Sequence, residues 1–308
     1  MRGWWYAALW AVLPLYGMLY YLPNIIAQLI LTFLTQVGIA QKEEVTAMGR
    51  LPEGLDECSG MVALAPNRLV MINDSGHEPI LWVLDTLGQL RQKLALPGLE
   101  NRDWESLAHN DSLLFVGDIG NNGNDRRDLC IYLLRWGFTE DSLNLQARGK
   151  LAFHYRDQRR FPPSAPRRHY DAEALIAVDD SLYIFTKSRA KPFHGLTYCY
   201  GLPARPGRGE ASRLDSFITG PGVRLTHWVS AADYDAAQQR LALLSYNRIW
   251  VFEQARPPHF FAQRPETIAL GFFSQLEGMT WRHSGGLWLG NERNNKQSGR
   301  LYRVRPMP

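Results

Sequence analysis

The sequence predicts an all-β fold: a β-propeller of five blades, with six as the alternative, preceded by an N-terminal transmembrane helix. Three observations support this. A pattern of an acid, small and apolar residues, a polar turn and a second apolar run ending in polar residues recurs five times. No helical period of 3.6 residues is sustained after residue 41. The first forty residues are almost entirely apolar.

The N-terminal segment predicts a membrane anchor. Asp, Glu, Lys and Arg are absent from Gly3 to Gln41, and this run exceeds the roughly 20 residues that a spanning helix needs. Arg2 precedes the run, which by the positive-inside tendency puts the N-terminus in the cytoplasm. We therefore expect an anchor over residues 1–40 and a propeller over 41–308, in the periplasm or extracellular space beyond the inner membrane. Secretion after cleavage near Ala40, which follows small residues, is the alternative.

The five repeats follow one another along the chain. They are the stretches ECSGMVALAPNRLVMINDSG from Glu57, DWESLAHNDSLLFVGDIGNN from Asp103, DAEALIAVDDSLYIFTKSRA from Asp171, AADYDAAQQRLALLSYN from Ala231 and LEGMTWRHSGGLWLGNE from Leu276. Equivalent positions, taken as Glu57, Glu105, Glu173, Ala231 and Glu277, lie 48, 68, 58 and 46 residues apart. Periods of this size with short strands and turn clusters are typical of propeller blades.

Further strands follow each hairpin, so that four strands a repeat is the economical interpretation. They include ILWVLDTLGQL, LCIYLLRW, LTYCYGLP and RIWVFEQA. The last repeat ends early, with GRLYRVR from Gly299. We expect the segment EEVTAMGRL, after the anchor, to supply its missing outer strand and close the ring without free edges. The longest interval is rich in Pro and Arg, which favours a loop over a sixth blade.

The hairpin of each repeat brings its first acid and its polar strand end to the same edge. The acids should therefore gather at one mouth around the axis. Carboxylates and an Asn amide, without Cys or a His trio, suit a hard cation, Ca²⁺ before Mg²⁺. The candidate ligands are Glu57, Asp74, Asp103, Glu105, Asp118, Asn121, Asp171, Glu173, Asp233, Glu277 and Glu292.

Three alternatives to a metal site remain open from the residues. In the first, the acids accept hydrogen bonds from backbone N–H groups and lock turns; in the second, they recognise a cationic ligand; in the third, Lys187 neutralises part of the ring internally. These alternatives differ in whether a bound ion is needed.

The motifs also carry a resemblance. NDSG, DWESLA, GDIGNN, DAEAL and ADYDAAQQRLALLSY, in this order over most of residues 50 to 295, resemble a group of uncharacterised bacterial secreted or anchored β-propeller proteins. The segment QLEGMTWRHSGGLWLGNE is similar to part of the calcium-dependent β-propeller phytases, and the ring more loosely resembles gluconolactonase-like propellers with one axial calcium. The resemblance implies a propeller whose repeat acids hold calcium.

A basic insertion precedes the third repeat. It connects an outer strand to the next inner strand, so we expect it on the face that carries the acids. Together with Lys187, its arginines are candidate groups for binding an anionic substrate: Arg159, Arg160, Arg167 and Arg168. Contact with anionic lipid headgroups is an equal alternative. His169 and His227 precede inner strands and are candidate general bases, with a structural role as the alternative.

Two functions follow as hypotheses. One is an extracytoplasmic, calcium-dependent hydrolase of a phosphate ester or lactone. The other is a non-catalytic module whose face binds an envelope component. The net charge of +4 does not indicate nucleic-acid binding, and the three cysteines, widely spaced, are expected as buried thiols. The absence of a nucleophile elbow, a zinc motif and a P-loop argues against several other enzyme classes.

Overall fold

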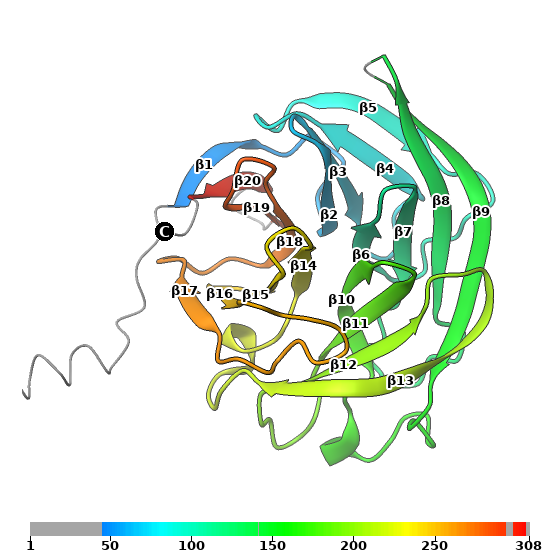
Figure 1. Ribbon diagram of the computed structural model, residues 1–308, viewed down its shortest axis with the longest axis vertical. Coiled ribbons are helices and arrows are strands. Elements are labelled where there is room, and N and C mark those ends of the chain that lie inside the picture. The colour runs from blue at the N-terminus through cyan, green and yellow to red at the C-terminus, as the bar shows by residue number, and fades with distance from the viewer. Residues whose placement is uncertain (1–44, 141, 294–297, 306–308) are drawn as a thin grey trace, which may run out of the picture. The chain divides into compact units, whose positions relative to one another are not determined.

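Five four-stranded units of β-sheet are arranged around a central axis (Figure 1). The computed structural model describes residues 45–140, 142–293 and 298–305, and the expected anchor over residues 1–40 lies outside them. These residues belong to the compact unit Lys42–Pro308. Within the described ranges no helix is both long and apolar enough to cross a membrane.

The first three units follow the order of the sequence. The first consists of β2 (Cys58–Ala65), β3 (Arg68–Asn73), β4 (Ile80–Leu84) and β5 (Leu90–Ala95). The second consists of β6 (Trp104–His109), β7 (Leu113–Asp118), β8 (Cys130–Thr139) and β9 (Ser142–Tyr155). The third consists of β10 (Asp171–Val178), β11 (Ser181–Lys187), β12 (Leu196–Pro203) and β13 (Gly207–Ile218).

The last two units complete the ring. The fourth consists of β14 (Ala231–Asp235), β15 (Arg240–Ser245), β16 (Arg248–Phe252) and β17 (Glu266–Ala269). The fifth consists of β18 (Leu276–Trp281), β19 (Leu287–Asn291), β20 (Arg300–Val304) and, as its outer strand, β1 (Val45–Arg50). The 3₁₀ turns η1 (Ala165–Arg167) and η2 (Arg224–Thr226) lie in the connections that precede β10 and β14.

Ring closure occurs as the sequence predicts. Strand β1 pairs antiparallel with β20, from Val45 opposite Val304 to Arg50 opposite Arg300. Because the first described strand completes the last unit, unfolding β1 exposes the edge of β20, and unfolding β20 exposes the edge of β1. The inner strands β2, β6, β10, β14 and β18 each contact the next one around the axis, and β18 contacts β2.

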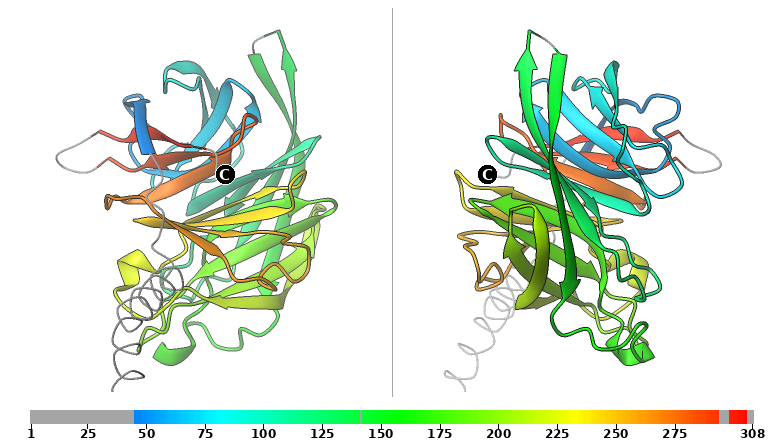
Figure 2. Two further views of the ribbon diagram at one scale, coloured as in Figure 1. Left: turned by 60° about the vertical axis from the view of Figure 1, so that its left-hand side comes forward. Right: turned by 90° about the vertical axis from the view of Figure 1, so that its right-hand side faces the viewer.

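Within its described residues, 105–140 and 142–173, the longest repeat interval contains no sixth unit. Its extra length goes into β8 and β9, whose hairpin rises beyond the neighbouring strands (Figure 2), and into the connection from Tyr155 to Asp171. The outer strand β9 also pairs parallel with β13, from Leu151 opposite Gly207 to Tyr155 opposite Ala211. This pairing joins the second and third units into one eight-stranded sheet and covers both outer edges there.

The hydrophobic core is divided among the interfaces between successive units. Both faces of most strands are therefore buried, and the sequence shows apolar runs rather than strict alternation. Cys58 packs between the fifth and first units, Cys130 between the first and second, and Cys199 between the third and fourth. All three are free and buried, as expected.

Candidate functional site

A bulge places an acid at the start of three inner strands. The pairing register shifts between Trp104 and Ser106, between Ala172 and Ala174, and between Leu276 and Gly278. The residue that each shift leaves without a partner in the strand pairing is a glutamate: Glu105, Glu173 or Glu277. A bulged residue turns away from the ladder and re-aims its side chain. We call the face at which the inner strands begin the acid face, and the face of their hairpin turns the turn face.

The three bulged glutamates converge near the axis. Glu105, Glu173 and Glu277 are 3%, 2% and 3% exposed, and each offers a carboxylate oxygen within 4.8 Å of the other two. Two oxygens bound to one Ca²⁺ at about 2.4 Å lie at most about 4.8 Å apart, so the spacing fits a shared ion. The oxygens supply the donor type that calcium prefers.

A buried lysine lies among these glutamates. Nζ of Lys187 is 2.8 Å from Oε2 of Glu173 and 3.5 Å from Oε1 of Glu277. The Tyr246 hydroxyl donates to Oε1 of Glu277 at 2.6 Å. Lys187 therefore neutralises part of the acidic ring, as one of the alternatives to a metal site predicts. Arg189 is shared between Glu173 and Asp171, so ionised Glu105, Glu173, Glu277 and Asp171 with Lys187 and Arg189 leave two negative charges, which a divalent cation balances.

Glu105 is the member of the group without a partner. In the part of the chain that the structure describes, no hydrogen bond or ion pair reaches its buried carboxylate. Glu105 also converges with Asp74 and Asp103, both half-buried, in a second group of three carboxylates. An unpartnered buried carboxylate is costly unless it is protonated or binds a cation.

Burial and mutual repulsion control the protonation of the cluster. Burial, reinforced by neighbouring carboxylates, raises the pKa of Glu105 well above its ordinary value and that of Asp74 to about 7. Burial and a hydrogen bond with Glu277 raise the pKa of Glu292 to about 10. Burial opposes charge on Glu277 as well, but Lys187 and the hydrogen bonds from Glu292 and Tyr246 together outweigh it and lower the pKa of Glu277. In the absence of a cation, protons therefore take up part of the excess charge.

Other predicted ligands form a structural network beside this cluster. Asp118 accepts a hydrogen bond from Nη2 of Arg126 at 2.7 Å. The Asn121 side chain accepts the backbone N–H groups of residues 125 and 126, and thus locks its turn. Asp171 accepts the N–H of Asn121 and pairs with Arg189. These three residues serve the acid face as supports of its loops.

The prediction that Asp233 shares the mouth is wrong. In β14 the pairing shows no bulge, and Asp233 lies opposite Ala242, near the hairpin turn. Its carboxylate accepts the hydroxyl of Thr280 at 2.8 Å and the N–H of Trp281 at 2.7 Å. Asp233 therefore lies on the turn face, because it stands two residues beyond Ala231, at which its repeat begins.

The alignment of the first and fourth repeats also needs correction. The register shift in β2 lies between Cys58 and Gly60, so that Ser59, and not Glu57, is the equivalent of Glu105. In the fourth repeat the equivalent is Ser230. Both serine hydroxyls donate at 2.6 Å to the carbonyl of the residue before a bulged glutamate, Ser59 to Trp104 and Ser230 to Leu276. Glu57 itself is exposed near the rim, 3.4 Å from His77.

The cationic residues predicted to bind substrate differ from one another in burial. Lys187 is buried and committed to Glu173 and Glu277. The arginines of the basic insertion lie in the β9–β10 connection on the acid-face side, with Arg159, Arg160 and Arg167 exposed and Arg168 half-buried. Their proposed contact with substrate stays a prediction.

The two candidate histidines have structural partners. Nδ1 of His169 lies 3.0 Å from the Ser188 hydroxyl, and burial lowers the pKa of His169. Nδ1 of His227 lies 2.9 Å from the Thr226 hydroxyl. These contacts favour the structural role for both.

Sequence reasoning missed Arg126, Arg189 and Tyr246. All three stand close after a polar strand end: Arg126 follows GDIGNN, Arg189 is two residues beyond Lys187, and Tyr246 directly follows β15. A basic or phenolic residue just beyond the polar end of a strand is the sequence signal that identifies these three residues.

The strands and the converging acids define a β-propeller with an acidic axial mouth. No protein-family model matches the sequence, and no curated protein matches it significantly. The PQQ-bound aldose sugar dehydrogenase of Streptomyces coelicolor aligns at 12% identity and a TM-score of 0.46, over 86% of this chain and 99% of that one. The WD40 propeller domain of Doa1 aligns at 10% identity and 0.42, over 84% and 97%. Likeness of this degree carries no inference about activity.

Proposed function

We propose that the acid face binds a calcium ion through Glu105, Glu173 and Glu277, and that the loaded mouth hydrolyses a phosphate ester or lactone outside the cytoplasm. The observation that carries the proposal is the buried Glu105 carboxylate, which has no hydrogen-bond or ion-pair partner among the described residues. A cation supplies the missing partner and balances the charge that Lys187 leaves over.

In this proposal the side chains have separate roles. Bound calcium supplies electrophilic polarisation of a phosphoryl or carbonyl oxygen. Because Ca²⁺ takes 6–8 oxygen ligands, three glutamates leave positions for water and substrate. Tyr246 holds Glu277 in place through its hydroxyl. Asp74 is half-buried and converges with Glu105 at the mouth, so we assign it proton abstraction from water.

Cations at one side of the mouth favour an anionic substrate. Arg189 and Arg224 both lie against the ring of Trp228, at 4.7 and 5.7 Å from its centroid. Arg189 is committed to Asp171 and Glu173, whereas Arg224 is exposed. Arg224 and the exposed arginines of the β9–β10 connection are the groups available to orient a phosphate or carboxylate.

A non-catalytic binding module is the second candidate, and one observation favours it. Lys187 already occupies the space between Glu173 and Glu277, so the cluster retains part of its compensation without an ion. In this alternative the acids and cations are structural, and the face binds an envelope component.

The test uses the full-length chain purified in detergent. Calorimetric titration with CaCl₂ should give binding that Glu105→Gln weakens strongly, while Glu266→Gln, on an exposed residue of β17, leaves it unchanged. The calcium-loaded protein should then hydrolyse p-nitrophenyl phosphate or a δ-lactone, and chelator should abolish turnover. Calcium binding without turnover would support the binding module. A flat titration would remove the calcium proposal.

Membrane attachment remains a proposal that rests on the uncharged run Gly3–Gln41. Full-length protein should sediment with the inner membrane and resist extraction by high salt and alkaline carbonate. Protease added to spheroplasts should digest the propeller. Recovery in the soluble fraction with an N-terminus near residue 41 would instead support cleavage and secretion.

A further inference from the structure

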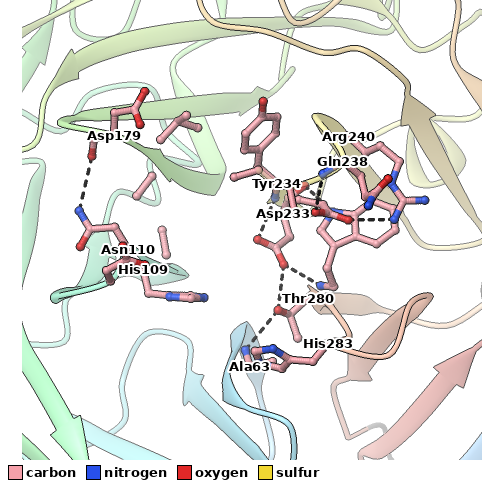
Figure 3. Close-up of a pocket in the computed structure, with 18 of the residues that line it drawn as sticks. Ala63, His109, Asn110, Asp179, Asp233, Tyr234, Gln238, Arg240, Thr280 and His283 are labelled. Carbon is pink, nitrogen blue, oxygen red and sulfur yellow. Dashed lines mark hydrogen bonds and ion pairs between the residues drawn. The ribbon is translucent and has the colours of Figure 1, made fainter.

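A cavity of about 920 Å³ opens on the turn face, at the end of the axis opposite to the glutamate cluster. All five units line it through the ends of their inner strands and the hairpin turns that follow. The contributors include Ala63, His109, Val178, Asp233 and Thr280. Figure 3 shows the ring of His109 directed into this space. The volume lies in the range that holds a drug-sized molecule.

The walls of this cavity are fixed by hydrogen bonds. Asp233 is fully engaged, since it accepts the hydroxyl of Thr280 and two backbone N–H groups. Thr280 in turn accepts the N–H of Ala63 at 3.2 Å, which ties the first, fourth and fifth units together (Figure 3). Arg240 pairs with Asp235 at 2.8 Å. A cavity with such walls is formed before any ligand arrives.

Three further carboxylates in the lining are exposed. They are Asp111, on the β6–β7 turn, and Asp179 and Asp180, on the β10–β11 turn. Within residues 45–140, 142–293 and 298–305, none of them forms an ion pair. Against five aspartates, the lining carries two arginines, Arg240 and Arg282, so negative charge is in excess there.

The arrangement suits an organic cation better than a metal ion. Among the described residues, the groups of three His, Cys, Asp or Glu side chains with ligand atoms within 4.8 Å of one another lie on the acid face. The carboxylates of the turn face are thus spread over the rim rather than focused on one point. Spread carboxylates around a cavity of this size attract a molecule that carries several positive charges.

We propose that the turn-face cavity binds a small organic cation with more than one amine group. Its ammonium groups interact with the exposed carboxylates of Asp111, Asp179 and Asp180. This site is independent of the calcium site and of the proposed hydrolysis, because it uses the opposite ends of the inner strands.

The test titrates the full-length chain with spermidine by calorimetry. Wild type should bind it at one site, and the double variant Asp179→Asn/Asp180→Asn should bind about tenfold more weakly. This variant preserves the turn, because Asp179 has φ of +52°, a region in which Asn is well tolerated. Circular dichroism before each titration verifies folding.

Two controls locate the binding. The double variant Glu253→Gln/Glu266→Gln removes two exposed charges outside the cavity and should bind spermidine as wild type does. Glu105→Gln, on the acid face, should also retain binding. Equal weakening in all three variants, strong weakening in Glu105→Gln alone, or equally tight binding of the uncharged 1,8-octanediol would overturn the proposal. So would the absence of spermidine binding to wild type.

Discussion

Nζ of Lys187 lies 2.8 Å from Oε2 of Glu173, and both side chains are almost completely buried. The same ammonium lies 3.5 Å from Glu277, so one cation from β11 links glutamates of the third and fifth units across the axis. Burial disfavours the charge on Lys187, but the glutamates outweigh it and raise its pKa well above the ordinary value. Lys187 is therefore permanently charged and is part of the cluster's electrostatic balance.

Lys187→Met should destabilise the calcium-free protein by about 3–5 kcal/mol, because it leaves buried carboxylates without their cation. Urea denaturation in chelator measures this loss, and Lys191→Met, on an exposed residue, should change stability by less than about 0.5 kcal/mol. Adding Glu173→Gln to Lys187→Met should restore part of the loss. Calcium should stabilise the Lys187→Met variant more than wild type, and a smaller effect of calcium there would contradict a shared ion site.

Stability without calcium should fall as pH rises from about 4 to about 7. The folded protein holds a proton on Asp74 with a pKa of about 7, whereas the unfolded chain releases it near the ordinary value of 3.8. The folded state therefore binds more protons in this window, and raising the pH favours unfolding. Glu105 and Glu173, whose pKa values are also raised, act with the same sign.

Calcium should flatten this pH dependence, because it replaces the protons, and its affinity should rise with pH over the same window. Melting temperatures between pH 4.5 and 8, in chelator and in CaCl₂, measure both effects. A melting temperature that rises with pH in chelator would show that protonated carboxylates do not stabilise the cluster.

Gly120→Ala should weaken calcium binding roughly 10- to 100-fold with little loss of stability. A Cβ at this position would lie 2.8 Å from Oε1 of Glu105 and closer still to the Asp103 carboxyl. These are the ends of side chains, which can move, so the fold survives while the ligand geometry changes. Gly137→Ala is the matched control, because a Cβ there meets nothing within 4 Å. Unchanged affinity in Gly120→Ala would place the ion away from Glu105.

Asp233→Asn should destabilise the protein by about 1–3 kcal/mol and leave calcium affinity unchanged. Its carboxylate accepts the N–H of Trp281 and the hydroxyl of Thr280 on the turn face, and an amide NH₂ cannot accept there. Urea denaturation and calcium titration of the same preparation separate the two effects. A fall in calcium affinity comparable with that of Glu105→Gln would return Asp233 to the set of candidate ligands.

The repeat pattern was sufficient to predict the ring and its closure. Acids, turns and polar strand ends recur at blade-sized intervals, and the segment around Val45 completes the short last unit as expected. Hairpins bring residues that are close in sequence to one edge, so the meeting of Glu277 with the end of β19 also followed from local chemistry.

The sequence by itself thus determined the class of fold, the ring closure and most of the acids on one face. Tertiary structure decided which of those acids converge. The bulges that select Glu105, Glu173 and Glu277 are register shifts of a single residue, and a single residue reverses the side of a strand to which a side chain points. Repeat spacing cannot resolve such a shift, which is why it predicts Glu57 and Ala231, in place of Ser59 and Ser230, as the equivalents of Glu105 and places Asp233 at the wrong end. The position of Lys187 between two units likewise depends on packing around the axis, because the residues that surround it come from separate strands of the ring.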